Sequence, residues 1–374
     1  MLHNSLISGT PYPYLKISRA ALKNNIKQVQ KICNKNTKIL WPVKANAYGC
    51  GIDTILPLIR EMNIHYLGVA NPFEGKLIRD YGYQGKILNL GGFYPENFSL
   101  LTDYEIIPSI TDLWQIDFIL KNIKTRKVID FHIKLDLGMG RMGIKQDEIP
   151  NLIKKLKNTT TLRLKGIFTH FPESDNIKAK SNSLIVESFK QLTNEIIDSL
   201  KYKRSEIILH AANSYAVLLN QRSHFDMVRP GLFLYGYFQN EKDRILYSRD
   251  FKIKPSISLY AKPVSLRTLN SGDTISYGST YKVETNAYTT AVLPIGYADG
   301  IPRALSNKIN FQNFPLHGRV TMDQIILGKV KSHYKEIELL GKSSPSLEHW
   351  ADLSNTVTYE IMTKLGHRLN RILD

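Results

Sequence analysis

The sequence has few of the features that mark secreted, membrane-spanning or metal-binding proteins. Only two cysteines occur in 374 residues, Cys33 and Cys50, so a disulfide framework is excluded and no metal-ligand spacing is present. We therefore expect no bound metal. No apolar run reaches the roughly 18 residues that a membrane span requires, and the N-terminus lacks the charged head and apolar core of a signal peptide. We expect a cytoplasmic protein.

Acidic residues are the other scarce group. Asp and Glu number 33 against 50 Lys and Arg, which gives a formal net charge of +17. Such a charge is typical of partners of nucleic acids or anionic membranes. Here the lysines are spread along the whole chain, with clusters no longer than 154–157, and no basic helix or nucleic-acid motif accompanies them. We therefore expect neither nucleic acid nor membrane as a partner, although the charge can attract small anions.

The first part of the chain alternates strand-like and helix-like segments. Long segments of helical period, such as 53–62, 112–121 and 183–200, separate short apolar or β-branched runs. This alternation predicts a (β/α)₈ barrel, and the competing doubly wound sheet lacks a glycine-rich dinucleotide turn after its first strand. The eight expected strands lie within 38–45, 65–70, 86–92, 105–110, 129–135, 164–170, 206–212 and 225–231.

The pattern changes after a charged connection at 240–254. Short strand-like runs without long helices follow, separated by turn signals such as Ser271-Gly272-Asp273. We therefore predict a barrel domain over residues 1–240 and a mostly-β domain over residues 241–374. We also expect a closing helical stretch at 356–373. The strand-like runs of the second domain are 257–269, 273–278, 288–296, 319–330 and 334–341.

Polar residues gather at the ends of the predicted barrel strands, where such barrels place their active sites. Lys44 ends the first strand within "WPVKANAYGCG". A lysine there can lose its proton and form a Schiff base with a carbonyl cofactor, whereas the plainer interpretation is a lysine that reaches into solvent. The other residues at strand ends are Lys134, Arg141, His170, Asn213, Ser214, Arg229, Gly231 and Leu232.

Each of these residues also has an ordinary structural interpretation. Asn213-Ser214 and Gly231-Leu232 follow strands seven and eight, where barrels commonly bind phosphate through helix N-termini, but Asn213 can equally cap a helix. Arg229 can form a structural salt bridge, and His170 can be a core histidine. Tyr48 can reach a phosphate or simply be buried. Tyr277 can act as a base only beside cations, because a free phenol has a pKa of about 10.

Taken together, the motifs resemble those of alanine racemases, which combine a (β/α)₈ barrel, a C-terminal β domain and pyridoxal phosphate. The resemblance covers nearly the whole chain, in family order. The matching segments are "VKANAYGCG" (43–51), "HIKLDLGMGRMG" (132–143), "GIFTHF" (166–171), "AANS" (211–214), "RPGLFLYG" (229–236), "ISYGSTY" (275–281), "IGYADGIPR" (295–303) and "GRVTMDQ" (318–324).

The resemblance implies roles for these residues. Lys44 would hold pyridoxal 5'-phosphate as a Schiff base and act as one acid/base group, and Tyr277 would be the other, contributed by the partner subunit of a homodimer. Arg229 would bind the pyridine nitrogen. The remaining implied roles are phosphate binding for Tyr48, Asn213, Ser214, Gly231 and Leu232, ring contact for His170, substrate binding for Arg141 and the partner-derived Met322, and carbamylation of Lys134.

One departure from the family pattern bears on function. Leu373 stands where the family usually ends in a phosphate-binding tyrosine, so cofactor binding should weaken without failing. The leading interpretation is interconversion of L- and D-alanine for peptidoglycan synthesis. The alternatives are a broad-spectrum amino-acid racemase, a pyridoxal phosphate-dependent decarboxylase, which Arg229 opposes, and a cofactor-binding protein without turnover.

Overall fold

The computed structural model describes residues 11–122, 128–157, 159–333 and 335–374. The first ten residues, part of the segment in which no signal peptide is predicted, lie outside that description. The chain forms two compact units. We call the unit made of Ile26–Ala45 and Leu56–Leu234 the barrel unit. We call the unit made of the chain up to Asn25, Asn46–Ile55 and Tyr235–Asp374 the β unit.

The barrel unit contains the eight predicted strand positions in the predicted order, so the barrel prediction is confirmed. Two parallel sheets, β10-β2-β3-β4-β5 and β6-β7-β8-β9, account for them. Pro108 separates β5 from β6 within one predicted strand, and the bond from Arg229 N–H to Ala212 O links the ends of β10 and β9. The strands are β2 (Lys38–Pro42), β3 (Tyr66–Val69), β4 (Lys86–Asn89), β5 (Ile106–Ile107), β6 (Ser109–Ile110), β7 (Ile129–Lys134), β8 (Leu162–Phe168), β9 (Ile208–His210) and β10 (Met227–Val228).

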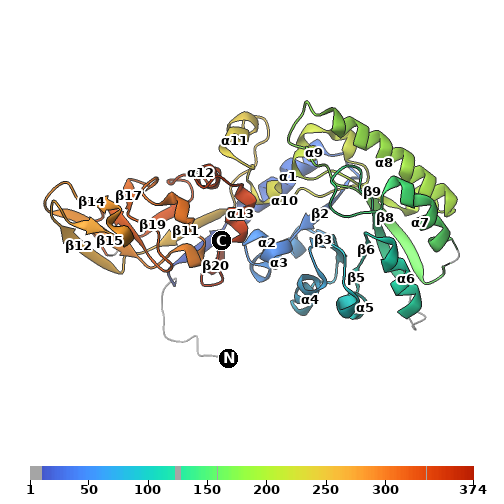
Figure 1. Ribbon diagram of the computed structural model, residues 1–374, viewed down its shortest axis with the longest axis horizontal. Helices are drawn as coiled ribbons and strands as arrows, with labels where there is room; N and C mark the ends of the chain where they lie inside the picture. Colours follow the sequence, from blue (N-terminus) through green and yellow to red (C-terminus); the bar gives the residue numbers. More distant parts are fainter. Residues whose placement is uncertain (1–10, 123–127, 158, 334) are drawn as a thin grey trace. The chain divides into compact units, whose positions relative to one another are not determined.

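Helices connect these strands. The three segments predicted from helical period are confirmed as α3, α6 and α8, and α6, α7 and α8 follow one another around the outside of the barrel unit (Figure 1). The helices up to the end of the barrel are α1 (Arg19–Ile32), α2 (Lys44–Tyr48), α3 (Ile52–Glu61), α4 (Pro72–Asp80), α5 (Phe98–Asp103), α6 (Leu113–Asn122), α7 (Ile149–Leu156), α8 (Lys180–Ser199), α9 (Ser214–Leu219) and α10 (Gly231–Tyr235).

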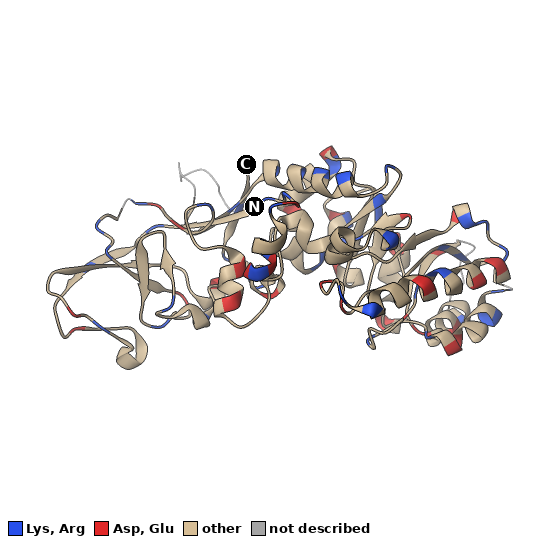
Figure 2. Cartoon of the chain, turned by 90° about the horizontal axis from the view of Figure 1, so that it is seen from above, with Lys and Arg blue, Asp and Glu red and all other residues tan. Residues whose placement is uncertain are grey.

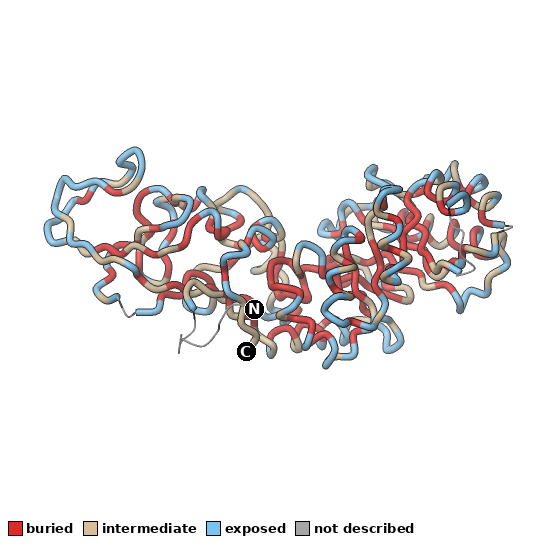
Figure 3. Tube along the Cα trace, turned by 90° about the horizontal axis from the view of Figure 1, so that it is seen from below, coloured by how far each residue is buried: buried red, intermediate tan, exposed pale blue. Residues whose placement is uncertain are grey.

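The barrel strands are buried on both faces, as their continuous apolar runs require. Leu40, Leu88 and Met227 are wholly buried and pack with Ile107 in one cluster. Figure 3 shows the same pattern along the chain, with buried strands and exposed connections. Fixed strands of this kind hold the residues that follow them in defined positions.

The β unit is built from two larger antiparallel or mixed sheets and a short hairpin. The sheets have the orders β19-β11-β1-β20 and β12-β15-β18-β17-β16, and β13 pairs with β14. The elements are β1 (Tyr14–Ile17), α11 (Glu241–Tyr247), β11 (Ile257–Ala261), β12 (Ser265–Leu269), β13 (Thr274–Ile275), β14 (Tyr281–Lys282), β15 (Tyr288–Leu293), β16 (Asn310–Phe311), β17 (Phe314–His317), β18 (Ile325–Gly328), β19 (Ile337–Leu340), α12 (Leu347–Leu353), α13 (Thr358–Thr363) and β20 (Asn370–Leu373).

The closing helical stretch predicted at 356–373 is wrong over most of its length. Only α13, Thr358–Thr363, is helical, and the chain then turns at Gly366, whose N–H donates to Asp299 O at 3.0 Å. The last residues form β20, which pairs in parallel with β1. The predicted domain division after residue 240 stays a prediction, although β1 belongs to a sheet of the β unit.

The charged residues follow the expected surface distribution. Lys and Arg are interspersed with Asp and Glu along the helices (Figure 2). Over the described ranges, the chain contains no helix that is both long and apolar enough to cross a bilayer.

Candidate functional site

The segment after β2 is a left-handed turn. Ala45, Asn46, Ala47 and Tyr48 have φ between 51° and 55°, a conformation that costs roughly 1–2 kcal/mol for each residue with a side chain. The turn is closed by bonds from Cys50 N–H to Ala47 O (3.1 Å) and from neighbouring amides. Four consecutive strained residues directly after Lys44 indicate a conformation kept for function, because such strain persists only where the surrounding structure enforces it.

The amine of Lys44 lies in a positive environment. The side chain is open to solvent, but surrounding protein atoms remove part of its hydration and lower its pKa, and the charge of Arg141 lowers it further. Glu74 opposes these effects, while Arg229 adds to them. A lysine with a lowered pKa has more of the neutral, nucleophilic amine at a given pH. Lys44 differs in this respect from an ordinary surface lysine, and its reactive role stays a prediction.

Glu74 is a residue of this region that the sequence did not single out. It accepts hydrogen bonds from Ala45 N–H and Ala70 N–H, both at 2.7 Å, so its carboxylate fixes the start of the left-handed turn. Asn71 caps the same helix by accepting from Glu74 N–H. The "NPFE" pattern indicates the helix start, but the contact with Ala45 depends on the pairing of β2 and β3.

Arg229 is buried directly after β10. One terminal nitrogen lies 3.0 Å from His210 Nδ1, and the other donates to Thr169 O at 2.7 Å and to Ala211 O at 3.1 Å. Burial lowers the pKa of Arg229 to about 9, which still leaves the guanidinium charged at neutral pH. These carbonyl and imidazole acceptors hold the guanidinium in one orientation without a carboxylate, so the salt-bridge interpretation from the sequence is not observed.

The histidines around Arg229 are neutral. Burial lowers the pKa of His132 and of His170 to about 3, and burial and Arg229 hold the pKa of His210 well below its ordinary value. His210 Nε2 lies 2.9 Å from His132 Nδ1. Because Arg229 can only donate, His210 accepts through Nδ1 and donates through Nε2. The sequence did not identify His210, which lies within the strand predicted at 206–212 and ends the observed strand β9.

Lys134 and Arg141 extend the positive cluster. Lys134 is buried, and burial together with Arg141 and Arg229 lowers its pKa to about 8. The loop that carries Arg141 is folded around Asp136, which accepts from Gly138, Gly140 and Arg141 N–H groups at 3.0–3.1 Å. Burial alone would raise the pKa of Asp136, but these backbone bonds lower it overall. The "DLGMGR" segment is therefore a carboxylate-centred turn.

Two short helices begin immediately after the last barrel strands. α9 starts at Ser214 after β9, and α10 starts at Gly231 after β10. Asn213 Oδ1 accepts from Ala216 N–H at 3.1 Å, so its side chain is a helix cap, the alternative that the sequence left open. Ser214 and Leu232 are buried at these helix starts. First-turn amides lack partners within a helix and can bind an anion.

Tyr48 ends the left-handed turn and belongs to the β unit. Its ring stacks on Tyr235 with centroids 4.8 Å apart and lies 6.1 Å from the ring of Tyr359. The side chain is only 4% exposed. The aromatic contacts therefore fix the direction of the Tyr48 side chain. A buried ring held in this way is compatible with a phenol that binds a phosphate.

A second group of predicted residues meets in the β unit. Tyr277 and Met322 line one hollow of about 770 Å³, together with Tyr297, Arg303 and Arg319. Tyr277 is 72% exposed and Met322 54% exposed. The two arginines bring positive charge to the hollow that Tyr277 lines. The turn that presents Tyr277 has positive φ at Ser276 and Gly278, and Ser276 Oγ donates to Arg319 O.

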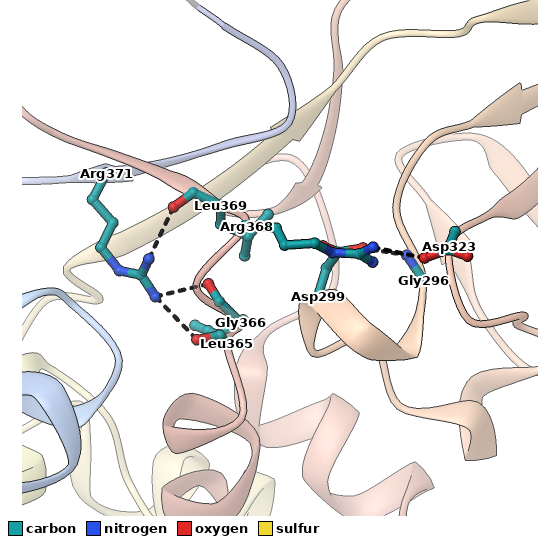
Figure 4. A network of polar contacts seen from close by, with 8 residues as sticks. All are labelled: Gly296, Asp299, Asp323, Leu365, Gly366, Arg368, Leu369 and Arg371. Atoms are coloured by element: carbon teal, nitrogen blue, oxygen red, sulfur yellow. Dashed lines mark hydrogen bonds and ion pairs between the residues drawn. The ribbon is translucent and has the colours of Figure 1, made fainter. Parts of the chain in front are cut away.

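Arg368 ties together the loops that line this hollow (Figure 4). It donates to both oxygens of the buried Asp299 at 2.9 Å and to Asp323 at 2.7 Å. Tyr297 N–H donates to Thr321 O, and Ala298 N–H donates to Met322 O. The position of Met322 relative to Tyr297 is therefore fixed by paired backbones and by one shared arginine.

The residues of the barrel unit fit an aldehyde cofactor that carries a phosphate. Lys44 offers an amine with a lowered pKa, Arg229 offers a rigid donor, and Lys134 and Arg141 add positive charge that suits anionic groups. Within the described part of the chain, no three His, Cys, Asp or Glu side chains gather as a metal site would require. The fold and these residues are thus those that a barrel enzyme binding such a cofactor would need.

Comparisons with known proteins agree with this class. The family model for the alanine racemase N-terminal domain matches residues 17–239, and the model for the C-terminal domain matches residues 256–373. An alanine racemase of Halothermothrix orenii is 33% identical over 374 residues, covering 96% of each chain, and one of Listeria monocytogenes is 32% identical over 378 residues, covering 98% of this chain and 99% of its own. The chain therefore belongs to the alanine racemase family.

Solved structures give the same result. A Bacillus anthracis alanine racemase with bound L-Ala-P has a TM-score of 0.88 and 27% identity, covering 98% of this chain and 96% of its own. A Bartonella henselae alanine racemase with covalently bound pyridoxal phosphate has a TM-score of 0.83 and 26% identity, covering 98% of this chain and all of its own.

The charge of Glu74 makes a testable difference to Lys44. Because this carboxylate raises the pKa of Lys44, Glu74→Gln should lower that pKa, whereas Glu74→Asp, which keeps the charge, should change it less. The pH dependence of Schiff-base formation between the apoprotein and pyridoxal phosphate measures this pKa. A midpoint for Glu74→Gln equal to or above that of the parent protein would contradict the assignment.

Proposed function

We propose that this protein is an isomerase that interconverts L- and D-alanine with pyridoxal phosphate held by Lys44. The observation that carries the proposal is the lowered pKa of Lys44 beside Arg141 and Arg229 in a chain of the alanine racemase family. When bound, pyridoxal phosphate supplies the aldehyde that takes up the amino group and the ring that draws electrons from the Cα–H bond. We further propose that the D-alanine formed serves peptidoglycan synthesis in the cytoplasm.

Inversion of the α carbon requires proton transfer on two opposite faces. We assign Lys44 to one face and Tyr277 to the other, each holding or returning the α proton. Tyr277 is well suited, because its phenol is exposed and shares its hollow with Arg303 and Arg319. We assign binding of the substrate carboxylate to Arg141 and contact with the substrate to the backbone at Met322.

Arg229 is proposed to bind the ring nitrogen of the cofactor. A guanidinium donates hydrogen bonds and accepts none, so it leaves this nitrogen unprotonated and the ring a weaker electron sink. A weaker electron sink suppresses side reactions of a racemase, whereas a decarboxylase needs the stronger electron sink of a protonated ring. His170, neutral and 3.5 Å from Arg229 Nη2, is proposed to lie against the ring. The phosphate is assigned to Tyr48, Ser214, Gly231 and Leu232, with Asn213 ordering the helix start.

Exchange of the α proton of alanine with solvent distinguishes the roles of the two proposed bases. Tyr277→Phe should slow racemisation by about 100- to 10,000-fold, the usual contribution of a general acid/base, while the α proton of one alanine enantiomer still exchanges with deuterium from water. Lys44→Ala should abolish both reactions. The measurements are loss of circular dichroism from L-alanine and proton NMR of each enantiomer.

A Tyr277→Phe variant that racemises at the parent rate would refute the two-base assignment. Bulkier amino acids belong in the same assay, because Leu373 replaces the tyrosine expected there and a broad-spectrum racemase is the second candidate. Turnover of such amino acids at rates near that of alanine would favour this alternative.

We propose a homodimer in which Tyr277 and Met322 complete the site of the partner subunit. The support is that both side chains are exposed in the isolated chain although they line the hollow assigned to catalysis. Catalysis needs the base beside Lys44, so a second copy that covers this surface would supply both the base and its burial.

Mixing two inactive variants tests this arrangement. When Lys44→Ala and Tyr277→Phe chains are unfolded and refolded together, each mixed dimer has one site with Lys44 and Tyr277 both intact. Half of the dimers are then mixed, so activity should return to about a quarter of the parent value. If both residues of a site came from one chain, the mixture would stay inactive. Refolding each variant alone is the control.

We also propose that Lys134 is carbamylated. Its amine adds carbon dioxide in the neutral form, forming an N–C bond and releasing one proton, and the resulting anion would balance Arg141 and Arg229. The pKa of about 8 makes the neutral amine far more abundant near neutrality than in an ordinary lysine with a pKa of about 10.

Labelled bicarbonate tests this modification. NMR should show a carbamate carbon signal that strengthens as the pH rises from 7 towards about 8, where the amine loses its proton. The signal should be absent from Lys134→Met. A signal that persists in that variant, or no signal in the parent protein, would refute the proposal.

A further inference from the structure

We propose that Arg371 is a positioning residue that fixes the left-handed turn and, through it, holds Tyr48 for the phosphate of the cofactor. The inference rests on the proposed function for the identity of that cofactor. It assigns to β20 the role of holding this turn through the side chain of Arg371. All of the residues involved, from Asn46 to Gly51 and from Leu365 to Leu373, belong to the β unit.

Arg371 makes only main-chain contacts among its observed hydrogen bonds. Its Nη1 donates to Leu369 O at 2.9 Å, and Nη2 donates to Leu365 O at 3.0 Å and to Gly366 O at 3.1 Å (Figure 4). Its Nε donates to Gly49 O at 2.8 Å. Because three carbonyls already fix the plane of the guanidinium, the Nε–H group points in one direction, and Gly49 must present its carbonyl there.

Gly49 directly follows Tyr48, so this bond acts on the end of the strained turn. Gly49 has φ of 81°, and a Cβ atom there would lie 2.1 Å from Met362 O. The turn thus lies against the backbone of α13, and a residue with a side chain does not fit at position 49. On the other side, Asn46 Oδ1 accepts from Ile52 N–H at 2.9 Å. Asn46 and Arg371 therefore hold the two ends of the segment that carries Tyr48.

The C-terminal sequence makes the hydrogen bond between Arg371 and Gly49 more important for cofactor binding. β20 pairs with β1, so Arg371 is anchored in a sheet next to Leu15, and Leu373 pairs with Ile17. Leu373 has no group that can donate to a phosphate, although the sequence resemblance places a tyrosine there. In this chain the strand contributes the arginine that orients Tyr48, but no phosphate ligand at position 373. Cofactor affinity in this chain should therefore depend on Arg371.

The test compares substitutions at two arginines, Arg371 within β20 and Arg368 just before it. Arg371→Lys keeps the charge but loses the fork of donors, and Arg371→Gln loses both. Arg368→Lys is the matched control, because Arg368 lies three residues earlier and binds Asp299 and Asp323 instead of the turn. Unfolding midpoints are recorded for each full-length protein, so that affinities are compared only among folded samples.

Cofactor affinity is the first readout. Titration of each apoprotein with pyridoxal phosphate should give a Kd about 10- to 100-fold weaker for Arg371→Lys than for the parent, the effect of losing one hydrogen bond to a charged acceptor. At saturating cofactor, kcat for alanine should stay within about threefold. Arg368→Lys should keep the parent Kd for the cofactor and raise the KM for alanine.

Dependence on Tyr48 is the second readout. In a Tyr48→Phe background, Arg371→Lys should weaken cofactor binding by less than about twofold further, because the arginine acts through that phenol. Independent, multiplying effects would overturn the proposal, as would an unchanged Kd in the Arg371→Lys single variant. Asn46→Ala, which loosens the other end of the turn, should weaken cofactor binding to a similar extent. It replaces the Arg371 variants in the test if those do not fold. Parent-like affinity in folded Asn46→Ala would also overturn the proposal.

Hydrogen exchange separates this inference from the proposed function, because it needs no cofactor. Amides at Cys50, Gly51 and Ile52 should exchange at least about tenfold faster in Arg371→Lys than in the parent protein or in Arg368→Lys. Equal exchange would overturn the inference even in an active enzyme. A parent protein that binds no pyridoxal phosphate would refute the proposed function, while the exchange rates would still decide whether Arg371 orders the turn.

Discussion

The burial of the positively charged Arg229 at the mouth of the barrel is the constraint on which the rest of the site depends. A buried charge without partners is very costly, and here the partners are main-chain carbonyls and His210 instead of a carboxylate. No carboxylate among the described residues pairs with Arg229. Burial is the main cause of the lowered pKa values of Lys44, Lys134, His170 and His210, and the charge of Arg229 adds to the lowering in each case.

Backbone strain is the second constraint. The left-handed turn from Ala45 to Tyr48 is unfavourable by itself, and it persists because several polar groups act on it. Within the barrel unit, Glu74 accepts from Ala45 N–H. Within the β unit, the side chain of Asn46 accepts from Ile52 N–H, and Arg371 donates to Gly49 O directly after the turn. A segment that must present a lysine and then a tyrosine in fixed directions is held by contacts from residues distant in sequence.

The sequence predicted the parts of the fold that depend on local pattern. The alternation of strand and helix periods led to the barrel, and the strand ends led to Lys44, Lys134, His170 and Arg229. The failure at 356–373 has a physical reason: its apolar spacing suits a helix, but β20 is stabilised by pairing with β1, which is almost the whole chain away. Non-local pairing of this kind leaves no local signal. The same holds for Glu74, His210 and Arg371, whose roles depend on contacts across strands and turns.

The site residues separate in the same way. The sequence motifs singled out Tyr277 and Met322, and the structure places both in one hollow of the β unit. The Arg368 network that fixes their loops was not apparent, because Asp299, Asp323 and Arg368 are ordinary charged residues until the fold brings them together. The motif around Asn213 suggested a phosphate ligand as well as a helix cap, and the structure shows that its side chain caps α9.

Lys44 is proposed to be the amine that holds the cofactor. The most direct measurement is to add pyridoxal phosphate to the purified protein, fix it with borohydride and locate the modified lysine by peptide mapping. We expect stoichiometric modification of Lys44, because this amine combines a lowered pKa with access to solvent. Modification of other lysines with Lys44 unlabelled, or no stable incorporation, would contradict it.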